Sequence, residues 1–412
     1  MRRNPARLFA TALLVASVLA PSAETPATAL HPPLPTNADR HKDERPPDGL
    51  GPEVTARLDK AIEDVRRQAG IPGVIVGLWM PGKGSYVRAT GVADTATRKP
   101  MTTDLFMRVG SETKTFTITA LLELVDDRRI RLDDPISAYV DGVPNGDRIT
   151  LRQLAEMRSG LFSYSNDPDF QRDLLSDPSR SFTPRELLAY GFKHSNLFAP
   201  GEEFQYSNTN TILLGLVIEK VSGLRLADFI HKRVTRPANL CHTLFPQGAE
   251  FPEPHAHGYS DQTLSGEIAD TTMWNPSWAW AAGAMISDLH DLRRWAKIVA
   301  TGTLLSPETQ RERLKVLPTG IPGLSYGLGI FELDGWIGHN GSLPGYESAT
   351  VYLPSQKATL VVLLNTDDDY QGQEPSTVLA RAITKIATPD NVYDGPPPPA
   401  LNVVPYGVSV IR

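Results

Sequence analysis

Segments with the pattern of β-strands lie near both ends of this chain, and a long stretch that favours α-helices separates them. Apolar runs bounded by turn residues predict strands at 73–80, 86–92, 326–333, 336–341, 349–353 and 359–365. Apolar residues at helical spacing precede the first strand at 54–68 and follow the last one at 376–386. The two ends are therefore alike in kind, which favours a single sheet to which both contribute.

The middle of the chain favours helices at 116–125, 151–157, 185–190, 211–221 and 226–234. With 412 residues, 41% of them hydrophobic, the chain is long enough to bury a sizeable core. We expect an α/β fold of the α+β type. Its antiparallel sheet is built from both chain ends and has flanking helices, and a mainly helical region is inserted at about 105–280. A cleft between the sheet and the inserted region is the expected place for a site.

The two termini are expected to lie outside this fold. Residues 1–29 have the pattern of a signal peptide, with a basic start, a short apolar run and a small-residue cleavage site. Pro-rich stretches predict a linker at 30–51 and a tail at 389–412, which leaves 52–388 for the folded domain. This organisation predicts a secreted protein, extracellular or in the cell envelope, with no stable membrane span after cleavage. An uncleaved N-terminal anchor is the alternative.

Composition excludes several classes of function. The formal net charge of −6 gives no reason to expect nucleic-acid binding. Cys241 is the only cysteine, so neither an intrachain disulfide nor a metal site built on several thiolates is possible. His255 and His257 could hold a metal, but two histidines without a recognisable third ligand are more often surface residues. We expect no metal and no cofactor, and the sequence gives no view of the oligomeric state.

The segment VGSETKTF places Ser111 and Lys114 where a strand-like run gives way to an apolar helix. A spacing of three residues puts both side chains on one face of that helix. Free backbone N–H groups at a helix start stabilise negative charge, and burial makes a lysine a better proton acceptor. Ser111 is thus a candidate nucleophile and Lys114 its activator. The simpler alternative is that Ser111 caps the helix and Lys114 is a solvated surface charge.

A second segment, QYSNTN, lies just before the predicted helix at 211–221. Tyr206 and Asn208 share one side of an extended chain, so both can face a cleft. A tyrosine hydroxyl can relay a proton, and an asparagine amide can donate to a substrate carbonyl. The alternative is a polar N-cap, with Asn208 or Thr209 capping the helix.

A third segment, GHNGS, follows the hairpin signal Asp334-Gly335. His339 and Gly341 share one face of the predicted strand, and Gly341 is expected to leave room for substrate backbone. The Ser342 N–H could form an oxyanion hole together with the Ser111 N–H. The alternative is an ordinary strand end that runs into a turn.

In the order S-x-x-K, Y-x-N and H-x-G, these segments resemble the penicillin-recognising serine hydrolases. The second and third motifs are similar to those of class C β-lactamases, family VIII esterases and secreted D-alanyl-D-alanine carboxypeptidases. The likeness covers about 52–388 and includes PGEEFQYSNTNTILLGLVIEKVSG and SWAWAAGAMISD. It is greatest for the secreted carboxypeptidases, whose third motif also begins with histidine. The resemblance implies a β-lactamase/transpeptidase-like fold.

The resemblance also implies roles for the catalytic residues. Ser111 attacks a carbonyl and forms an acyl-enzyme. Lys114 and Tyr206 share the general-base role and then protonate the leaving amine, and the sequence does not decide which of them holds the key proton. The expected substrate is a D-alanyl-D-alanine peptide of the peptidoglycan type.

Further residues are expected to bind the substrate. By the resemblance, Asn208 orients the acylated side, and His339 supplies a polar or cationic group near the carboxylate of the leaving group. Three other positions resemble pocket-lining residues of the secreted carboxypeptidases, namely Phe162, Ser165 and Trp278.

One departure from the family pattern bears on the substrate. The secreted carboxypeptidases carry an arginine on the strand before the hairpin, where it grips a terminal carboxylate, but this chain has Ile330-Phe331-Glu332 there. Losing a bidentate guanidinium weakens carboxylate binding. Amidase or endopeptidase activity therefore stays open as an alternative. So does esterase activity on an ester or β-lactamase activity on a β-lactam. A non-catalytic penicillin-binding sensor is the rival from another class, although such a protein would usually have lost Ser111, Lys114 or Tyr206.

Overall fold

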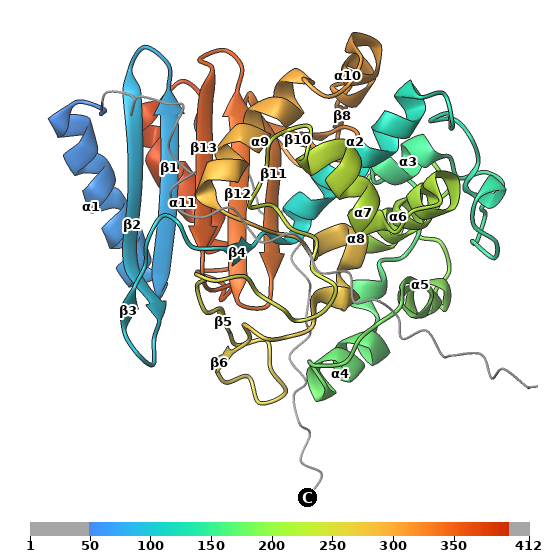
Figure 1. Ribbon diagram of the computed structural model, residues 1–412, viewed down its shortest axis with the longest axis horizontal. Helices are drawn as coiled ribbons and strands as arrows, with labels where there is room; N and C mark the ends of the chain where they lie inside the picture. Colours follow the sequence, from blue (N-terminus) through green and yellow to red (C-terminus); the bar gives the residue numbers. More distant parts are fainter. Residues whose placement is uncertain (1–48, 395–412) are drawn as a thin grey trace, which may run out of the picture. The chain divides into compact units, whose positions relative to one another are not determined.

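The computed structural model describes residues 49–394, which are built around a nine-stranded antiparallel sheet (Figure 1). The predicted signal peptide, almost all of the predicted linker and most of the predicted tail lie outside these residues. The strands follow one another across the sheet in the order β3 (Lys99–Pro100), β2 (Gly84–Asp94), β1 (Gly73–Met80), β13 (Ala358–Leu364), β12 (Tyr346–Leu353), β11 (Trp336–Leu343), β10 (Phe331–Leu333), β9 (Leu324–Tyr326) and β8 (Leu317–Pro318).

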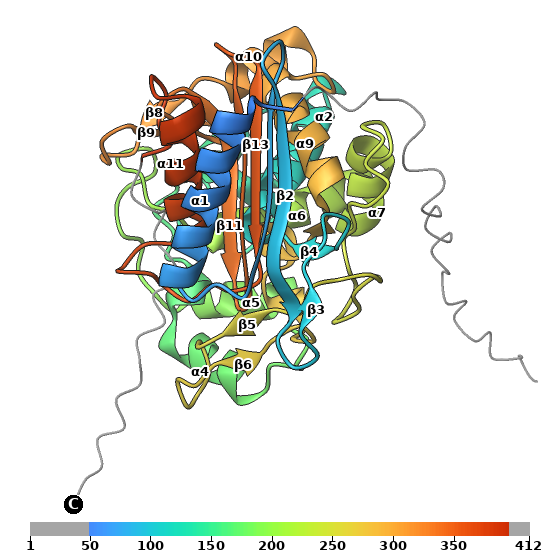
Figure 2. The same ribbon diagram turned by 90° about the vertical axis from the view of Figure 1, so that its left-hand side faces the viewer.

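The central strands β1, β12 and β13 are buried along their whole length. Figure 2 shows the reason: α1 (Pro52–Gln68) and α11 (Pro375–Ala387) cover one face of the sheet, and α9 (Leu289–Thr301) covers the other. A strand covered on both faces needs apolar side chains at every position, which explains the uninterrupted apolar runs in the sequence. Strand β1 pairs directly with β13, so the expected sheet from both chain ends is confirmed.

The inserted region is mainly helical and lies on the β11 side of the sheet (Figure 1). Helix α2 (Thr113–Asp126) runs through its middle and is buried at nearly every residue. Around it lie α3 (Leu151–Ala155), α4 (Pro168–Ser176), α5 (Pro184–Phe192), α6 (Asn208–Ser222), α7 (Leu226–Ile230), α8 (Trp280–Gly283) and α10 (Pro307–Arg313). Two short strand pairs, β4 (Met107–Arg108) with β7 (Ile286–Ser287) and β5 (Tyr259–Ser260) with β6 (Ala269–Asp270), complete the described elements.

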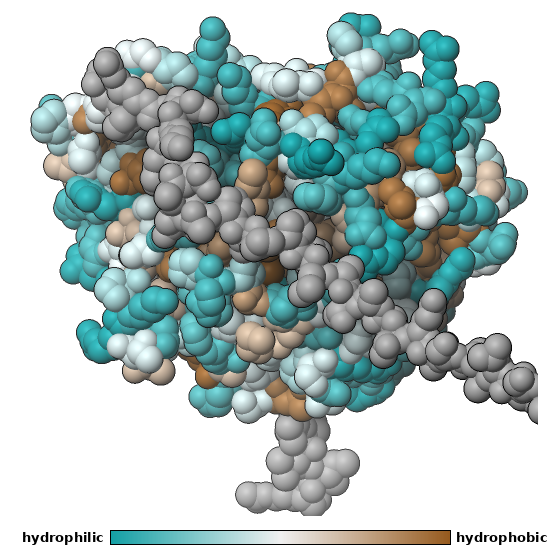
Figure 3. Space-filling model, viewed as in Figure 1, coloured by the Kyte–Doolittle hydropathy of each residue, from teal (hydrophilic) through white to brown (hydrophobic). Residues whose placement is uncertain are grey.

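In the view of Figure 3, hydrophilic side chains predominate and hydrophobic ones form small groups. Within residues 49–394, no helix is both long enough and apolar enough to cross a bilayer.

The prediction of one continuous strand at 326–333 is wrong. The chain turns back at Gly327–Gly329 and forms two strands, β9 and β10, which pair with each other. Gly329 has a φ of +67°, and a Cβ atom there would come within 2.4 Å of the Ile118 side chain on α2. The turn therefore brings the backbone against the buried helix, a contact that a local apolar pattern does not report.

Helix α9 was not predicted from the sequence, although it packs against both the central sheet and α2. Its Trp295 ring stacks on the Phe116 ring of α2 at a centroid distance of 4.1 Å. The Trp295 indole N–H also donates to the Thr115 hydroxyl at 2.7 Å. The buried apolar residues of α9 recur at helical spacing, so the sequence carries the pattern that predicts this helix.

A 3₁₀ turn at Gly110–Glu112 leads into α2 and lies directly against β11. Gly110 has a φ of +51°, and a Cβ atom on it would lie 2.8 Å from the Ser342 nitrogen. The turn is held in place by two hydrogen bonds. The Val109 N–H donates to the Met285 carbonyl at 3.1 Å, and the Ser348 hydroxyl of β12 donates to the Val109 carbonyl at 3.0 Å. The sheet and the helical region therefore meet at this point without room for a side chain.

Replacing Gly110 with alanine is expected to destabilise the fold by more than its backbone conformation alone would cost. The matched control is Gly82→Ala, because Gly82 also has a positive φ, of +82°, but has open space where a Cβ would stand. The control should lower the free energy of unfolding by about 1 kcal/mol, whereas Gly110→Ala should cost about 2–4 kcal/mol. Denaturant unfolding of both variants measures this difference, and equal losses would contradict the close contact.

Candidate active site

An open cleft lies where the helical region meets β11. It is lined by Ser111, Ser163, Tyr164, Ser165, Asn166, Gln205, Tyr206, Asn208, Trp278, Ala279, Ala282, Gly283, Asn340, Gly341, Ser342, Leu343 and Glu374. The predicted residues Ser111, Ser165, Tyr206, Asn208, Trp278, Gly341 and Ser342 are thus brought together from distant parts of the chain. A concave site lined by both polar and aromatic side chains is typical of a small-molecule or peptide site.

Ser111 lines the cleft, and the buried Lys114 is hydrogen-bonded to it. Ser111 lies in the 3₁₀ turn, two residues before α2 begins, and its side chain is partly exposed. The Lys114 ammonium nitrogen donates to the Ser111 hydroxyl and to the Ala282 carbonyl, each at 2.9 Å. Lys114 is fully buried, and no carboxylate among the described residues forms an ion pair with it. Burial alone therefore lowers the pKa of Lys114 well below its usual value of 10.5, which makes the neutral amine accessible.

Tyr206 stands over Lys114, whose nitrogen lies 4.8 Å from the centre of the tyrosine ring. Burial raises the pKa of Tyr206, and the nearby Ser111 hydroxyl offsets part of that rise. The Tyr206 hydroxyl is buried and makes no hydrogen bond of good geometry to another described residue. A hydroxyl that lies beside the nucleophile and has no hydrogen-bond partner is suited to a proton transfer that begins only when substrate is bound.

A chain of polar side chains forms the opposite wall. The Asn208 amide donates to the Ser165 hydroxyl at 3.1 Å, and the Ser163 and Ser165 hydroxyls are 2.9 Å apart. The Asn208 backbone N–H donates to Ser163 at 3.0 Å, so neither the side chain of Asn208 nor that of Thr209 caps α6. The Asn208 amide oxygen has no partner among the described residues and remains available to a ligand. Trp278, which is 4% exposed, provides an aromatic wall of the same cleft.

Gly341 is required for a different reason from the one predicted. A Cβ atom on it would lie 2.0 Å from the Val109 carbonyl oxygen and 2.9 Å from the Ser111 nitrogen. The space above Gly341 is therefore filled by the nucleophile turn, not kept free for substrate. The same contact brings the Ser111 and Ser342 backbone nitrogens to one side of the cleft, the arrangement that an oxyanion hole needs.

The role predicted for His339 as a cationic binding group is wrong. The side chain is 1% exposed, lies outside the residues that line the cleft, and lines a small apolar pocket with Tyr326 and Phe331. Burial, together with the Lys114 charge, lowers the pKa of His339 to about 3. One ring nitrogen lies 3.0 Å from the Tyr326 hydroxyl and the other 2.5 Å from the Asn340 carbonyl. His339 is thus a neutral residue that packs behind Tyr206, with ring centres 6.1 Å apart.

Phe162 does not line the cleft either. Its ring stacks on His194 at a centroid distance of 3.9 Å, on the side away from Ser163 and Ser165. The 3₁₀ turn at Tyr164–Asn166 follows directly, and Ser163 and Ser165 line the cleft whereas Phe162 does not. The resemblance placed the right segment at the site but assigned one of its residues to the wrong side.

Two cleft residues were missed by sequence reasoning. The Asn340 amide donates to the Glu374 carboxylate at 2.7 Å, and both residues are nearly completely buried. Burial raises the pKa of Glu374 to about 8, although the bond from Asn340 opposes this and Asp369 adds to it. Glu374 precedes α11, 35 positions from the third motif, so no local pattern could have found it. Within the described lining, no arginine, lysine or histidine side chain faces the cleft.

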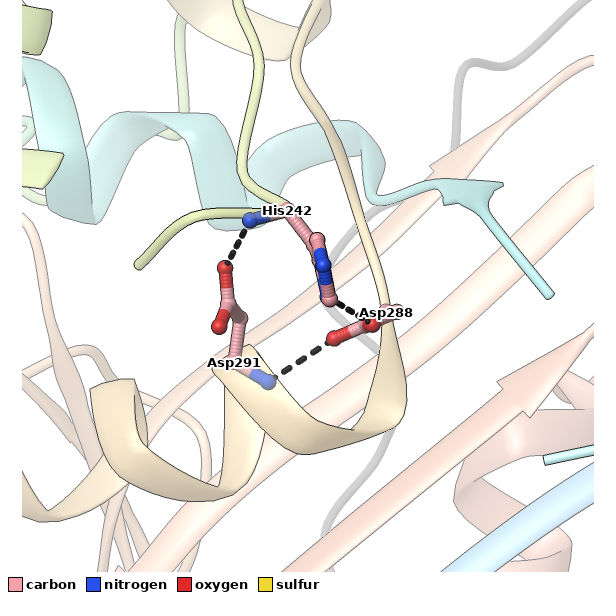
Figure 4. Close-up of side chains that lie close together, drawn as sticks. All are labelled: His242, Asp288 and Asp291. Atoms are coloured by element: carbon pink, nitrogen blue, oxygen red, sulfur yellow. Dashed lines mark hydrogen bonds and ion pairs between the residues drawn. The ribbon is translucent and has the colours of Figure 1, made fainter. Parts of the chain in front are cut away.

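A second cluster of buried ionisable groups lies elsewhere, at His242, Asp288 and Asp291 (Figure 4). Asp288 accepts from the Asp291 N–H at 2.9 Å and lies 2.7 Å from a His242 ring nitrogen, while Asp291 accepts from the His242 N–H at 2.7 Å. These bonds cap α9 and attach the preceding loop to it, which accounts for the cluster as a structural element. His255 and His257 belong to a separate surface region, where His257 lies 2.7 Å from Asp270.

Comparison with known proteins agrees with the geometry. The sequence profile of the family described as Beta-lactamase matches residues 58–384. Among solved structures, a D-stereospecific amidohydrolase from a Streptomyces species is 32% identical with a TM-score of 0.70, covering 76% of this chain and 94% of its own. The D-amino acid amidase from Ochrobactrum anthropi SV3, complexed with L-phenylalanine amide, is 27% identical with a TM-score of 0.72, covering 81% and 98%.

A curated relative points to the same group of proteins. A D-aminopeptidase from Brucella anthropi is 30% identical over 319 residues, which is 75% of this chain and 59% of that protein. The match to protein flp from Staphylococcus aureus, 27% identical, likewise spans only 64% of that protein's length. With its S-x-x-K turn at the start of a buried helix, its antiparallel sheet and its match over residues 58–384, this chain belongs to the beta-lactamase family, within the superfamily of β-lactamases and penicillin-binding proteins.

Proposed function

We propose that this protein hydrolyses amide bonds in which a D-amino acid residue provides the acyl group, through an acyl-enzyme on Ser111. The observation that carries the proposal is the 2.9 Å hydrogen bond from the buried Lys114 nitrogen to the Ser111 hydroxyl. A neutral lysine in this position can take the serine proton directly. The preference for a D-acyl residue is supported by the amidohydrolase, amidase and aminopeptidase named above.

In the proposed mechanism, the Ser111 oxygen attacks the carbonyl carbon while its proton passes to Lys114. The Ser111 and Ser342 N–H groups stabilise the oxyanion of the tetrahedral intermediate. When the C–N bond breaks, the Tyr206 hydroxyl gives its proton to the leaving amine and recovers one from Lys114. Water then attacks the acyl ester, its proton returns through the same groups, and Ser111 leaves as the alcohol. Asn208 orients the acyl side throughout.

The separate proton-transfer roles of Lys114 and Tyr206 follow from the burial of each side chain. Burial disfavours the charged form of each group, so it makes the lysine neutral and the tyrosine a phenol. A neutral amine accepts a proton, whereas a phenol donates one. We therefore assign the general-base step to Lys114 and the protonation of the leaving group to Tyr206.

A D-alanyl-D-alanine carboxypeptidase is the second candidate, supported by the resemblance of the three motifs to secreted carboxypeptidases. The described cleft lining offers no cation for a terminal carboxylate, which favours the amidase or aminopeptidase type of reaction. Comparing D-Ala-D-Ala with its C-terminal amide separates the two. A carboxypeptidase prefers the free carboxylate, and the proposed activity does not. We further propose that the protein acts outside the cytoplasm, supported by the pattern of residues 1–29.

Ser111→Ala is expected to abolish the hydrolysis of D-alanine 4-nitroanilide, with kcat/KM falling by at least about 10⁴-fold because the variant lacks the hydroxyl to which Lys114 is hydrogen-bonded. Ser355→Ala, in an exposed turn, is the matched control and should behave as wild type. The D-anilide should be cleaved faster than the L-anilide. Cleavage of neither anilide, with an aryl ester or a penicillin consumed instead, would replace the proposal by an esterase or β-lactamase. If wild type hydrolyses none of these substrates and intact-mass measurement detects no penicillin adduct, the result would favour the alternative of a non-catalytic binding sensor.

Lys114→Arg is expected to lower kcat/KM by about 10²–10⁴-fold, because a guanidinium stays protonated and cannot take the Ser111 proton. The control is Lys297→Arg on the exposed side of α9. In wild type, activity requires neutral Lys114, so kcat/KM should rise with pH through a pKa well below 10.5. A pH–rate profile of free enzyme tests the sign, and activity that increases as the pH falls would argue against a lysine base.

Tyr206→Phe should impair amides more than aryl esters. An amine leaves poorly unless it is protonated, whereas a nitrophenolate leaves without a proton. We expect a loss of about 10²-fold or more on the D-anilide and a much smaller loss on the matched D-alanine nitrophenyl ester. Tyr139→Phe removes a hydroxyl far from the cleft and serves as the control. Equal losses on both substrates would mean that Tyr206 acts in an earlier step.

A further inference from the structure

The Glu374 side chain is an unexpected component of a hydrolase cleft. It is 3% exposed, lines the cleft beside β11, and is the only carboxyl group among the described lining residues. Its partner is the Asn340 amide, which donates to it at 2.7 Å. A buried carboxyl that opens into a ligand cleft without a cationic partner is costly, so it calls for an explanation beyond packing.

The same corner of the cleft has too few hydrogen-bond donors. The Asn340 amide oxygen is buried, and no described residue donates to it. Close by, Glu347 of β12 lies opposite Ser342 in the sheet and accepts from the Ser376 N–H at 2.8 Å, while its other carboxyl oxygen has no described partner. Buried acceptors are nearly always satisfied in folded proteins. A ligand with several N–H donors would satisfy the oxygens of Asn340 and Glu374 together.

The position of Glu374 relative to the reaction follows from its neighbours. Glu374 lines the same cleft as Tyr206, which is assigned to protonate the leaving amine, and the hydrogen bond from Asn340 places Glu374 on the β11 side of that cleft. Asn340 is two residues before Ser342 on β11 and shares that side. Asn208, Ser165 and Ser163 form the other wall, where the acyl group is expected. The corner at Asn340 and Glu374 therefore faces the leaving group.

We propose that Glu374 and Asn340 form a subsite for a primary ammonium group carried by the leaving part of the substrate. This inference rests on the proposed function and names its substrate class: D-aminoacyl amides and peptides whose leaving amine bears a second, protonated amine. Once a bound ammonium favours its ionised form, the Glu374 carboxylate provides the countercharge and the Asn340 oxygen accepts a second N–H. A carboxylate on the leaving group supplies neither a positive charge nor an N–H donor.

The charges around Glu374 agree with this ligand. Asp369, in the loop before α11, raises the pKa of Glu374. Glu374 in turn raises the pKa of three other acidic groups, namely Glu347 on β12, Tyr206 before α6 and Tyr393 beyond α11. None of them is a cation. An ammonium group would therefore supply the missing positive charge and would favour the ionised carboxylate, so binding releases a proton where the carboxyl was neutral.

The test uses three D-alanyl amides that differ only at the end of the leaving group. The leaving amines are 1,2-diaminoethane, propylamine and β-alanine, which place an ammonium, a methyl or a carboxylate at the same distance. At pH 7 wild type should prefer the ammonium to the carboxylate by at least about 100-fold in kcat/KM, with the neutral amide between them. In Glu374→Gln this ratio should fall by at least about tenfold. A ratio of two substrates is independent of the fraction of variant that folds.

Glu267→Gln, the same chemical change at an exposed position, is the control and should keep the wild-type ratio. A wild-type preference for the carboxylate, or a ratio unchanged in Glu374→Gln, would overturn the inference. If no D-alanyl amide is cleaved, the proposed function fails while the subsite can still be tested. Inhibition of 4-nitrophenyl acetate hydrolysis by butylammonium should then exceed inhibition by butyrate in wild type and lose that advantage in Glu374→Gln. Equal inhibition by both ions in wild type would refute the subsite itself.

Discussion

The close contact between the turn at Gly110–Ser111 and strand β11 is the constraint on which the rest of the site depends. Neither Gly110 nor Gly341 has room for a Cβ atom, because each backbone lies where the side chain of the other would stand. Only this approach places the Ser111 and Ser342 nitrogens on one side of a cleft. It also joins the two halves of the fold, since the turn belongs to the helical region and β11 to the sheet.

Burial then decides the proton states that the chemistry uses. Lys114, Tyr206, His339 and Glu374 are all enclosed by apolar surroundings, and each is driven toward its neutral form. The consequence differs with the acid–base character of the group: the lysine becomes a base, the tyrosine a donor and the histidine a packing residue. Glu374 differs from the others because it is the only carboxyl group among the described lining residues and these residues supply no cation for it. One physical effect thus produces a catalytic group, a scaffold group and a group suited to bind a ligand.

Sequence reasoning succeeded where a local pattern carries the information. The strand at 73–80 and the helix at 211–221 follow from apolar spacing, and the hairpin follows from Asp334-Gly335, whose φ values are both positive. It failed where the outcome depends on a distant neighbour. The segment 326–333 is split because Gly329 meets Ile118, and Phe162 turns away because His194 offers it a stacking surface. His339 was assigned the right strand but the wrong charge, since its pKa depends on burial.

What the sequence by itself determined is the set of local elements, their arrangement as a sheet from both ends around a helical insert, and the pairing of Ser111 with Lys114. These follow from apolar periodicity and from the spacing of two residues along one turn. Only the tertiary structure decided that Gly341 is filled by the nucleophile turn, that His339 lies behind the cleft, and that Glu374 faces it. These outcomes depend on which surfaces are brought together and desolvated. The partners in such contacts are tens to hundreds of residues apart, so no periodic pattern in the sequence predicts them.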